Sequence, residues 1–422
     1  MLYFILVWLQ KTIFRLYLKH IHVTNLDAIP LNKPVVIACN HPGAFMDPGF
    51  IGNIIPKPIH FTTRGDVFAN PIVRKILKGM HLNPVYRFDE GFGNLTKNFE
   101  TIENLTDVLK NNGIVLIFSE GYGAVDRRLK PLRKGTARIF LQIAAEHNLD
   151  IQLYAAGLTY THKINFRKSI LCSFSEPLFL KDYLTDFITH RQRGYHTFSK
   201  ELACRISDNF VVVENPECDA MVDLHINYQC NTEKLSIVPI VKHNRKKLTQ
   251  LQTLSKAINL LFKQDPLAFQ ELEKRTNAYE EALIHNKISD CGLTATKLNF
   301  GEWILILLAL PLSTLGFFFF GIPFLIAKKI SDKKVTRIDF YDSVCMNSVM
   351  LIYSIIALTT NILLAFNIGW WSCLTFIIAP ALGMITAWTY DALLRDREAR
   401  RADKCLGKEK MLQLRKTVVE FM

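Results

Sequence analysis

Short apolar runs alternate with helical patterns between residues 34 and 180, and this alternation constrains the fold more than any other feature of the sequence. The runs have the length and composition of buried strands, and the intervening segments place apolar residues three to four positions apart, as amphipathic helices do. We expect strands at 34–39, 58–63, 83–86, 113–118, 151–158 and 170–174, and helices around 66–78, 95–111 and 134–147. This order predicts an α/β fold with a mostly parallel sheet flanked by helices on both faces.

The first apolar run ends in a loop that carries a histidine and an aspartate, in the sequence NHPGAFMD at residues 40–47. Open α/β sheets bind their ligands at the carboxyl ends of the strands, so this loop is a candidate site. His41 has the chemistry of a general base near neutral pH, and Asp47 would fix its tautomer and stabilise the imidazolium. Taken alone, the pair is also compatible with an ordinary capped loop.

Three further stretches accompany this loop, namely GMHLNPVYR at 79–87, FSEG at 118–121 and YAAGL at 154–158. In their order and spacing, the four blocks resemble those of the glycerolipid acyltransferase family, which includes glycerol-3-phosphate and lysophosphatidate acyltransferases. The resemblance extends over residues 30–180. Five residues separate His41 from Asp47, where four are common, and this spacing resembles a sub-branch that includes fungal-type glycerol-3-phosphate/dihydroxyacetone-phosphate acyltransferases.

The resemblance implies an O-acyltransferase in which His41 deprotonates the attacking hydroxyl and Asp47 orients His41. The donor would be an acyl thioester (acyl-CoA or acyl-carrier protein) acting as co-substrate, with no cofactor or metal required. The expected acceptor is glycerol-3-phosphate or dihydroxyacetone phosphate, in phosphatidic acid and phospholipid synthesis, with 1-acylglycerol-3-phosphate as the alternative. Glu120 and Gly121 are further candidates for substrate binding: Glu120 would brace the third block, and backbone N–H groups near Gly121 would hold the oxyanion.

Several basic residues are candidates for binding the acceptor phosphate. Arg87 matches the family's arginine that is tied to this phosphate, and a guanidinium suits the role through its planar fork. Arg64 is a further candidate, in a Thr-Arg-Gly-Asp turn. A basic cluster, made of Arg127, Arg128, Lys130, Arg133 and Lys134, leads into a predicted helix. We take its last two members, Arg133 and Lys134, as phosphate ligands because a helix N-terminus attracts anions. The alternative for the cluster is a solvated face.

Two other functional classes were weighed against this interpretation. A serine hydrolase would require a Gly-x-Ser-x-Gly elbow, but the residue two positions before Ser119 is Ile117. The family's third block usually has proline and threonine where this chain has Ser119 and Tyr122, which would permit a catalytically silent membrane lipid-binding protein on the same fold. The intact pair of His41 and Asp47 argues against that alternative.

The composition favours a protein held against anionic lipid. The net charge is +13 and the isoelectric point is about 9.2, yet 49% of the residues are hydrophobic, which is unusual for a nucleic-acid binder. The nine cysteines form no C-x-x-C pair and no cluster at metal-binding spacing. We therefore expect reduced thiols and no nucleic-acid partner.

The expected organisation has five parts: an interfacial membrane helix at 1–22, the catalytic domain at 23–200, a helical accessory region at 201–300, a membrane domain at 301–390 and a basic cytosolic tail at 391–422. A core helix is the alternative for the first part. In the membrane domain we expect a re-entrant segment at 303–327, which Pro311 and Pro323 interrupt, and a transmembrane hairpin at 344–390. Basic residues flank the hairpin on both sides, so the positive-inside rule places both flanks, with the catalytic domain, on the cytosolic face.

Overall fold

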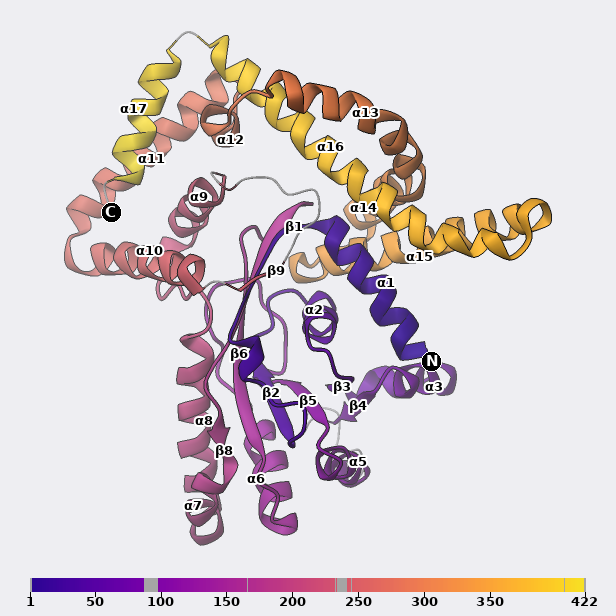
Figure 1. The fold of residues 1–422 in the computed structure, drawn as a ribbon. Helices are drawn as coiled ribbons and strands as arrows, with labels where there is room; N and C mark the ends of the chain where they lie inside the picture. The colour runs from indigo at the N-terminus through magenta and orange to yellow at the C-terminus, as the bar shows by residue number, and fades with distance from the viewer. Residues whose placement is uncertain are drawn as a thin grey trace.

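The computed structural model describes residues 2–86, 98–164, 166–231, 233, 241–243, 245–405 and 407–420. Its strands are β1 (Leu18–Thr24), β2 (Val35–Cys39), β3 (Ile59–Arg64), β4 (Leu82–Val85), β5 (Ile114–Phe118), β6 (Gln152–Tyr160), β7 (Lys168–Phe174), β8 (Leu178–Phe179) and β9 (Val241–Lys242). They form one sheet in the order β4-β3-β5-β2-β6-β7-β1-β9, with β8 paired to β6 (Figure 1). Neighbouring strands are parallel except that β6 runs antiparallel to β7 and β8. The mostly parallel sheet predicted from the sequence is confirmed.

The central strand β2 divides its side chains between two hydrophobic cores, because alternate residues of a strand point to opposite faces. Val35, Ile37 and Cys39 pack on one face with helices α1 (Leu2–Tyr17), α2 (Met46–Ile54) and α15 (Ile338–Ile368). Val36 and Ala38 pack on the other face with α5 (Asn98–Lys110), α6 (Gly135–His147) and α8 (Arg191–Ser207). A strand buried on both faces explains why this run is apolar without alternation.

The start of the chain differs from the expected helix over 1–22. Helix α1 ends at Tyr17, and the next residues form β1, which lies between β7 and β9 in the sheet. The first turns of α1 expose Phe4 and Trp8, whereas Ile13 and Leu16 are fully buried. Only the beginning of the helix therefore offers an apolar surface to a membrane, and its end belongs to the core.

The accessory region is helical and packs on the catalytic domain. It contains α9 (Asp219–Cys230), α10 (Arg245–Gln264), α11 (Pro266–His285) and α12 (Asp290–Thr294). Buried side chains of α9, α10 and α11 form a third hydrophobic cluster, which includes Leu171 of the sheet and Val211. The region therefore extends the core of the catalytic domain.

The last part of the chain, for which we expect a basic cytosolic tail at 391–422, packs on the accessory region. Its last helix, α17 (Lys408–Val419), packs against α11, with Met411 and Val418 buried in the same hydrophobic cluster as Tyr279. Arg415 donates from Nε to Oδ1 of Asp290 at 2.6 Å. The apolar residues between the basic ones explain why this segment folds back onto the accessory region (Figure 1).

Two stretches are long and apolar enough to cross a membrane, at 300–334 and 338–403. The first comprises α13 (Phe300–Gly316), a π-helical turn at Phe317–Gly321 and α14 (Ile322–Lys334), and the second comprises α15 and α16 (Thr375–Asp403). Helix α13 packs along α16, and α14 packs along α15 (Figure 1). A Cβ atom on Gly316 would lie 2.2 Å from the carbonyl oxygen of Leu382, so the two backbones touch where the shorter hairpin turns.

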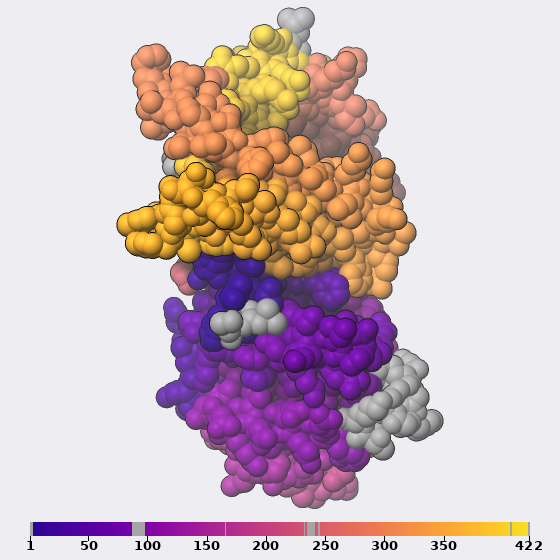
Figure 2. All heavy atoms as spheres, turned by 90° about the vertical axis from the view of Figure 1, so that its right-hand side faces the viewer, coloured from indigo at the N-terminus to yellow at the C-terminus, as the bar shows by residue number. Residues whose placement is uncertain are grey.

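Both ends of the stretch 300–334 lie away from the tip of the longer hairpin. The N–H of Leu298 donates to Asp396 near the end of α16, and the hydroxyl of Tyr341 at the start of α15 donates to Asp332. The shorter hairpin is therefore nested in the longer one. Figure 2 shows these helices gathered in the upper part of the molecule, above the catalytic domain.

The longer hairpin extends beyond the expected limits of 344 and 390 at both ends. The added turns carry polar residues that bind the catalytic domain, since Asp342 pairs with Lys168 and Asp391 pairs with Arg167. The tip is exposed and apolar, with Phe366 at 85% and Trp370 at 72% exposure. Helices α15 and α16 therefore bind the catalytic domain through polar residues at one end and expose apolar side chains at the other.

Candidate active site

The loop after β2 brings His41 and Asp47 together. Nδ1 of His41 lies 2.8 Å from Oδ2 of Asp47, and the two side chains are 19% and 0% exposed. The register of β2 against β5 pairs Cys39 with Phe118, and the His41 ring stacks on the Phe118 ring at a centroid distance of 3.9 Å. The imidazole is therefore held by a carboxylate at one edge and by an aromatic ring on one face.

The Asp47 carboxylate is fixed by two further donors. Its Oδ2 accepts the N–H of Gly43 at 2.7 Å, and its Oδ1 accepts the hydroxyl of Tyr160 at 2.7 Å. Burial raises the pKa of Tyr160 well above its ordinary value, so the phenol stays protonated as a donor. A Cβ atom on residue 43 would lie 2.7 Å from Oδ1 of Asp47 and 2.9 Å from the Tyr160 ring, so only glycine fits there.

These contacts fix the tautomer of His41. An ionised carboxylate only accepts hydrogen bonds, so the imidazole proton lies on Nδ1 and the lone pair lies on Nε2. The histidine also lines a cavity of about 1150 Å³. His41 thus lies beside a space large enough for a substrate, with Nε2 as the ring nitrogen that Asp47 leaves free to accept a proton.

Glu120 connects the His41 loop to the segment before α6. One carboxylate oxygen accepts the N–H of His41 at 3.1 Å, and the other accepts the N–H of Lys130 at 2.8 Å. Burial raises the pKa of Glu120, which is 3% exposed. Although the sequence made it a substrate-binding candidate, Glu120 does not line the cavity, and its contacts are those of a brace between two loops.

Gly121 lies at the cavity wall, but its own N–H donates to the carbonyl of Phe118 at 3.0 Å. An N–H group that is already paired in the resting structure is a poor oxyanion donor. The expected oxyanion site near Gly121 therefore needs another donor in this loop.

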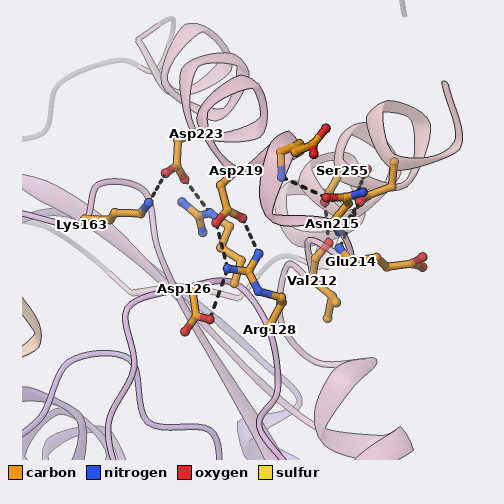
Figure 3. A network of polar contacts seen from close by, with 12 residues as sticks. Asp126, Arg128, Lys163, Val212, Glu214, Asn215, Asp219, Asp223 and Ser255 are labelled. Atoms are coloured by element: carbon orange, nitrogen blue, oxygen red, sulfur yellow. Dashed lines mark hydrogen bonds and ion pairs between the residues drawn. The ribbon is translucent and has the colours of Figure 1, made fainter. Parts of the chain in front are cut away.

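The basic cluster splits into a structural part and a part that faces the cavity. Arg127 donates to Asp223, and Arg128 forms a two-pronged ion pair with Asp219 at 2.7 and 2.9 Å (Figure 3). Both aspartates belong to α9, so these arginines tie the accessory region to the catalytic loop. Lys130 pairs with Asp126 in the same loop. The cluster is neither the solvated face nor the complete anion site that the sequence suggested.

Arg133 and Lys134 line the cavity, together with Gly135 at the start of α6. Lys134 contacts the Gln192 side chain at 3.3 Å, whereas the Arg133 guanidinium makes no hydrogen bond or ion pair with any residue that the structure describes. Arg64 also lines the cavity and pairs with Asp66. The N-terminus of α6 and these cations together suit an anion. Arg87 lies outside the described residues.

Some parts of the site carried no sequence signal. Tyr160 comes two residues after the fourth block, and its link to Asp47 depends on a strand pairing that the sequence does not encode locally. Phe340 in the first turn of α15 and Arg337 just before this helix also line the cavity, almost 300 positions after His41. Only the folded chain reveals that an apolar helix of the C-terminal part closes this side of the site.

Comparison with known proteins agrees with the geometry. The family model described as Acyltransferase matches residues 20–157, which include the His41 loop, Glu120 and most of β6. This region, 138 of the 422 residues, matches the acyltransferase family. The predicted resemblance to glycerolipid acyltransferases is thereby confirmed at the level of the family.

Two curated relatives match part of this chain. Glycerol-3-phosphate O-acyltransferase 2 of Saccharomyces cerevisiae is 31% identical over 157 residues, which cover 36% of this chain and 21% of the yeast protein. The 1-acyl-sn-glycerol-3-phosphate acyltransferase of Bacillus subtilis is 30% identical over 120 residues, which cover 28% of this chain and 55% of that protein. The chain thus spans about a fifth of one relative and about half of the other. The C-terminal helices lie outside the family match.

The crystal structure of the 1-acyl-sn-glycerophosphate (LPA) acyltransferase PlsC from Thermotoga maritima is a more distant match. It is 14% identical, with a TM-score of 0.34 over 49% of this chain and 79% of that chain. The fold assignment rests on the sheet of this acyltransferase domain itself.

Proposed function

We propose that this protein transfers a fatty acyl chain from an acyl thioester to a hydroxyl of glycerol-3-phosphate or dihydroxyacetone phosphate. The observation that carries the proposal is the 2.8 Å contact between Asp47 and His41, which lies at the wall of a large cavity. The Asp47 carboxylate is fully buried and accepts three hydrogen bonds. A histidine oriented in this way is a general base for a hydroxyl. The family match and both relatives support acyl transfer as the reaction.

In the proposed reaction, Nε2 of His41 takes the proton of the acceptor hydroxyl while its oxygen attacks the thioester carbonyl. The tetrahedral intermediate then collapses, the carbon–sulfur bond breaks and the imidazolium returns the proton to the leaving thiolate. Asp47 stabilises the imidazolium by its negative charge, and Tyr160 and Gly43 keep the carboxylate in place. No covalent enzyme intermediate is needed in this sequence of steps.

The cavity lining supports substrates that are part apolar and part anionic. Side chains of α1, α2 and β3 give it apolar walls, which include Leu6, Val7, Phe45 and Phe61. Arg133, Lys134 and the N-terminus of α6 give it positive charge. An acyl chain and a phosphate group would thus both find complementary surfaces.

We further propose that the enzyme is an integral membrane protein with its catalytic domain on the cytosolic face. The bare apolar tip of α15 and α16, the exposed apolar start of α1 and the lysines and arginines at the base of the hairpins support this placement. The stretch 300–334 would be re-entrant, because both of its ends lie at the base of the longer hairpin.

A parallel acceptor assay tests the proposal. Purified full-length protein in lipid nanodiscs receives radiolabelled palmitoyl-CoA with glycerol-3-phosphate, dihydroxyacetone phosphate or 1-acylglycerol-3-phosphate. We expect labelled monoacyl product from the first or second acceptor. Product from the 1-acyl acceptor alone would show that the acceptor assignment is wrong. A folded protein that acylates none of the three, with palmitoyl-CoA or with palmitoyl-acyl-carrier protein, would instead be the lipid-binding alternative.

A further inference from the structure

Helix α15 holds the loop between His41 and Asp47 directly. The Ser343 hydroxyl donates to the carbonyl of Gly43 at 2.6 Å and accepts the N–H of Met46 at 3.0 Å. Ser343 is fully buried, so neither bond has to compete with water. One side chain, 300 positions away in sequence, thus bridges the two backbone groups that flank the turn of the catalytic loop.

The loop contains features that make such a bridge consequential. Ala44 has a φ of 44°, in the left-handed region that is unfavourable for a residue with a side chain. Gly43 lies against both Asp47 and Tyr160, with no room for a Cβ atom. A small shift of this turn would move the Gly43 N–H and the Asp47 carboxylate together, and with them the imidazole.

The same helix reaches Asp47 by a second, independent route. Asp342, the neighbour of Ser343, pairs with Lys168, which is 2% exposed. The Lys168 ammonium lies 4.1 Å from the centre of the Tyr160 ring, and Tyr160 donates to Asp47. Asp342 also accepts the hydroxyl of Tyr17 at 2.7 Å, which fixes this end of α15 against α1.

We propose that Ser343 is a positioning residue for His41 and Asp47, so that the first turns of α15 are a working part of the active site and not only a membrane anchor. The proposal rests on the acyltransferase function proposed above. It adds that the acyltransferase domain of residues 20–157 is incomplete without the C-terminal hairpin. Within the loop, the Met46 N–H donates to the Gly43 carbonyl at 2.9 Å, and Ser343 adds a second hydrogen bond to each of these two groups from outside the domain.

Two substitutions at this position separate alignment from folding. Ser343→Ala removes both hydrogen bonds, and Ser343→Cys fills nearly the same space with a thiol that is a weak donor and acceptor. We expect each to lower kcat by about 10- to 100-fold, the scale of a misplaced catalytic group, with the KM for palmitoyl-CoA and for glycerol-3-phosphate within about threefold of wild type. The matched control is Ser354→Ala on the same helix, where the hydroxyl bonds only to the carbonyl of Met350. It should keep wild-type kcat.

Hydrogen exchange followed by mass spectrometry gives a readout that does not depend on the reaction. Ser343→Ala and Ser343→Cys should increase deuterium uptake in the peptide that covers residues 41–47, with uptake in β5 and β6 unchanged. A substitution that only weakens the fold would raise uptake throughout the domain, and this result would overturn the proposal. Wild-type kcat in the Ser343 variants, or an equal loss in Ser354→Ala, would also overturn it. If wild-type protein acylates no acceptor, the proposed reaction is wrong, and the exchange pattern still decides whether Ser343 fixes the loop.

Discussion

The geometry of Asp47 makes its replacement by asparagine a demanding test at the scale of single residues. Both carboxylate oxygens accept hydrogen bonds, from His41 and Gly43 on one oxygen and from Tyr160 on the other. An asparagine has one accepting oxygen, so its amide group must face either the Tyr160 hydroxyl or the Nδ1 side of His41. The second arrangement selects the wrong imidazole tautomer, with the proton on Nε2.

We expect Asp47→Asn to lower kcat by about 10²- to 10⁴-fold, in the range of a lost general base. The thermal midpoint should also fall, because the amide group that faces His41 leaves the buried Gly43 N–H without its partner. Steady-state kinetics with saturating palmitoyl-CoA and a melting curve of the same preparation measure both quantities. Activity within a factor of three of wild type would mean that Asp47 does not orient the base.

Glu120 gives a second test at this scale. Its two oxygens each accept a backbone N–H, from His41 and Lys130. In Glu120→Gln one of these donors would face an amide NH₂ group and lose its partner, which costs about 1–3 kcal/mol for a buried group. We expect lower thermal stability and about tenfold lower kcat, because the His41 backbone shifts. Equal stability and rate in the variant, measured in the same assays, would contradict this bracing role.

The sequence was informative about the proposed catalytic pair and less so about the residues that support it. His41 and Asp47 lie in one local motif, and Glu120 in another, so short-range pattern was enough to propose them. Tyr160, Lys168 and Ser343 act through contacts that arise only when β6, β7 and α15 meet. Such contacts leave no trace in spacing or periodicity.

At the scale of elements, the strands and helices between residues 34 and 180 were predictable because each has a clear apolar period and a Gly, Pro or Asn boundary. All six expected strands and all three expected helices are present, within a few residues of the predicted limits. Strand β1 was missed because its sequence, LKHIHVT, has the same mixed apolar and basic character as the helix before it. Tertiary pairing with β7, and not local propensity, makes it a strand.

The burial of His225 in α9 makes the stability of the folded protein depend on pH. The ring is 2% exposed, and burial lowers the pKa of His225 to about 4 from an ordinary value near 6.5. Between these two pH values the unfolded chain binds a proton that the folded chain does not. Stability contributed by neutral His225 is therefore present above pH 6.5 and is lost as the pH falls toward 4.

The variant His225→Gln should show a shallower loss of stability than wild type when the pH falls from 7 to 5. Between pH 7 and pH 5 the wild-type protein should lose about 2 kcal/mol more unfolding free energy than His225→Gln. Urea unfolding of the full-length protein at the two pH values measures it, and the other buried histidines cancel because they are present in both proteins. Parallel pH profiles for the two proteins would show that His225 is not buried in its neutral form.

For the whole molecule, the central consequence is that the catalytic domain and the base of the membrane hairpins form one body. Hydrogen bonds from Ser343 and ion pairs of Asp342 and Asp391 attach the hairpin to the catalytic loop, β7 and the turn before it. The sequence predicted both parts but not their contact. The apolar segments were recognised by their composition. The buried polar residues at their bases have the same composition as solvent-exposed residues that flank a membrane segment, so the sequence did not single them out.

This arrangement predicts that Lys333 and Lys404 lie on the same side of the membrane as His41. Lys333 is near the end of α14 and Lys404 follows α16, and both sites are remote from the tip at Trp370. Single cysteines at positions 333, 370 and 404, in a cysteine-free background, can be labelled in sealed vesicles with an impermeant maleimide. Positions 333 and 404 should react from one side. Labelling of 333 and 404 from opposite sides would show that 300–334 crosses the membrane completely.

The most direct test of the whole account is the rate of acyl transfer by His41→Ala, measured with palmitoyl-CoA and the preferred acceptor beside the wild-type protein. The control is His196→Ala, which removes an exposed histidine of α8 outside the cavity. We predict that His41→Ala loses about 10²- to 10⁴-fold in kcat with an unchanged melting curve, and that His196→Ala keeps the wild-type rate. A folded His41→Ala protein that acylates at a near wild-type rate would contradict the role of the His41–Asp47 pair.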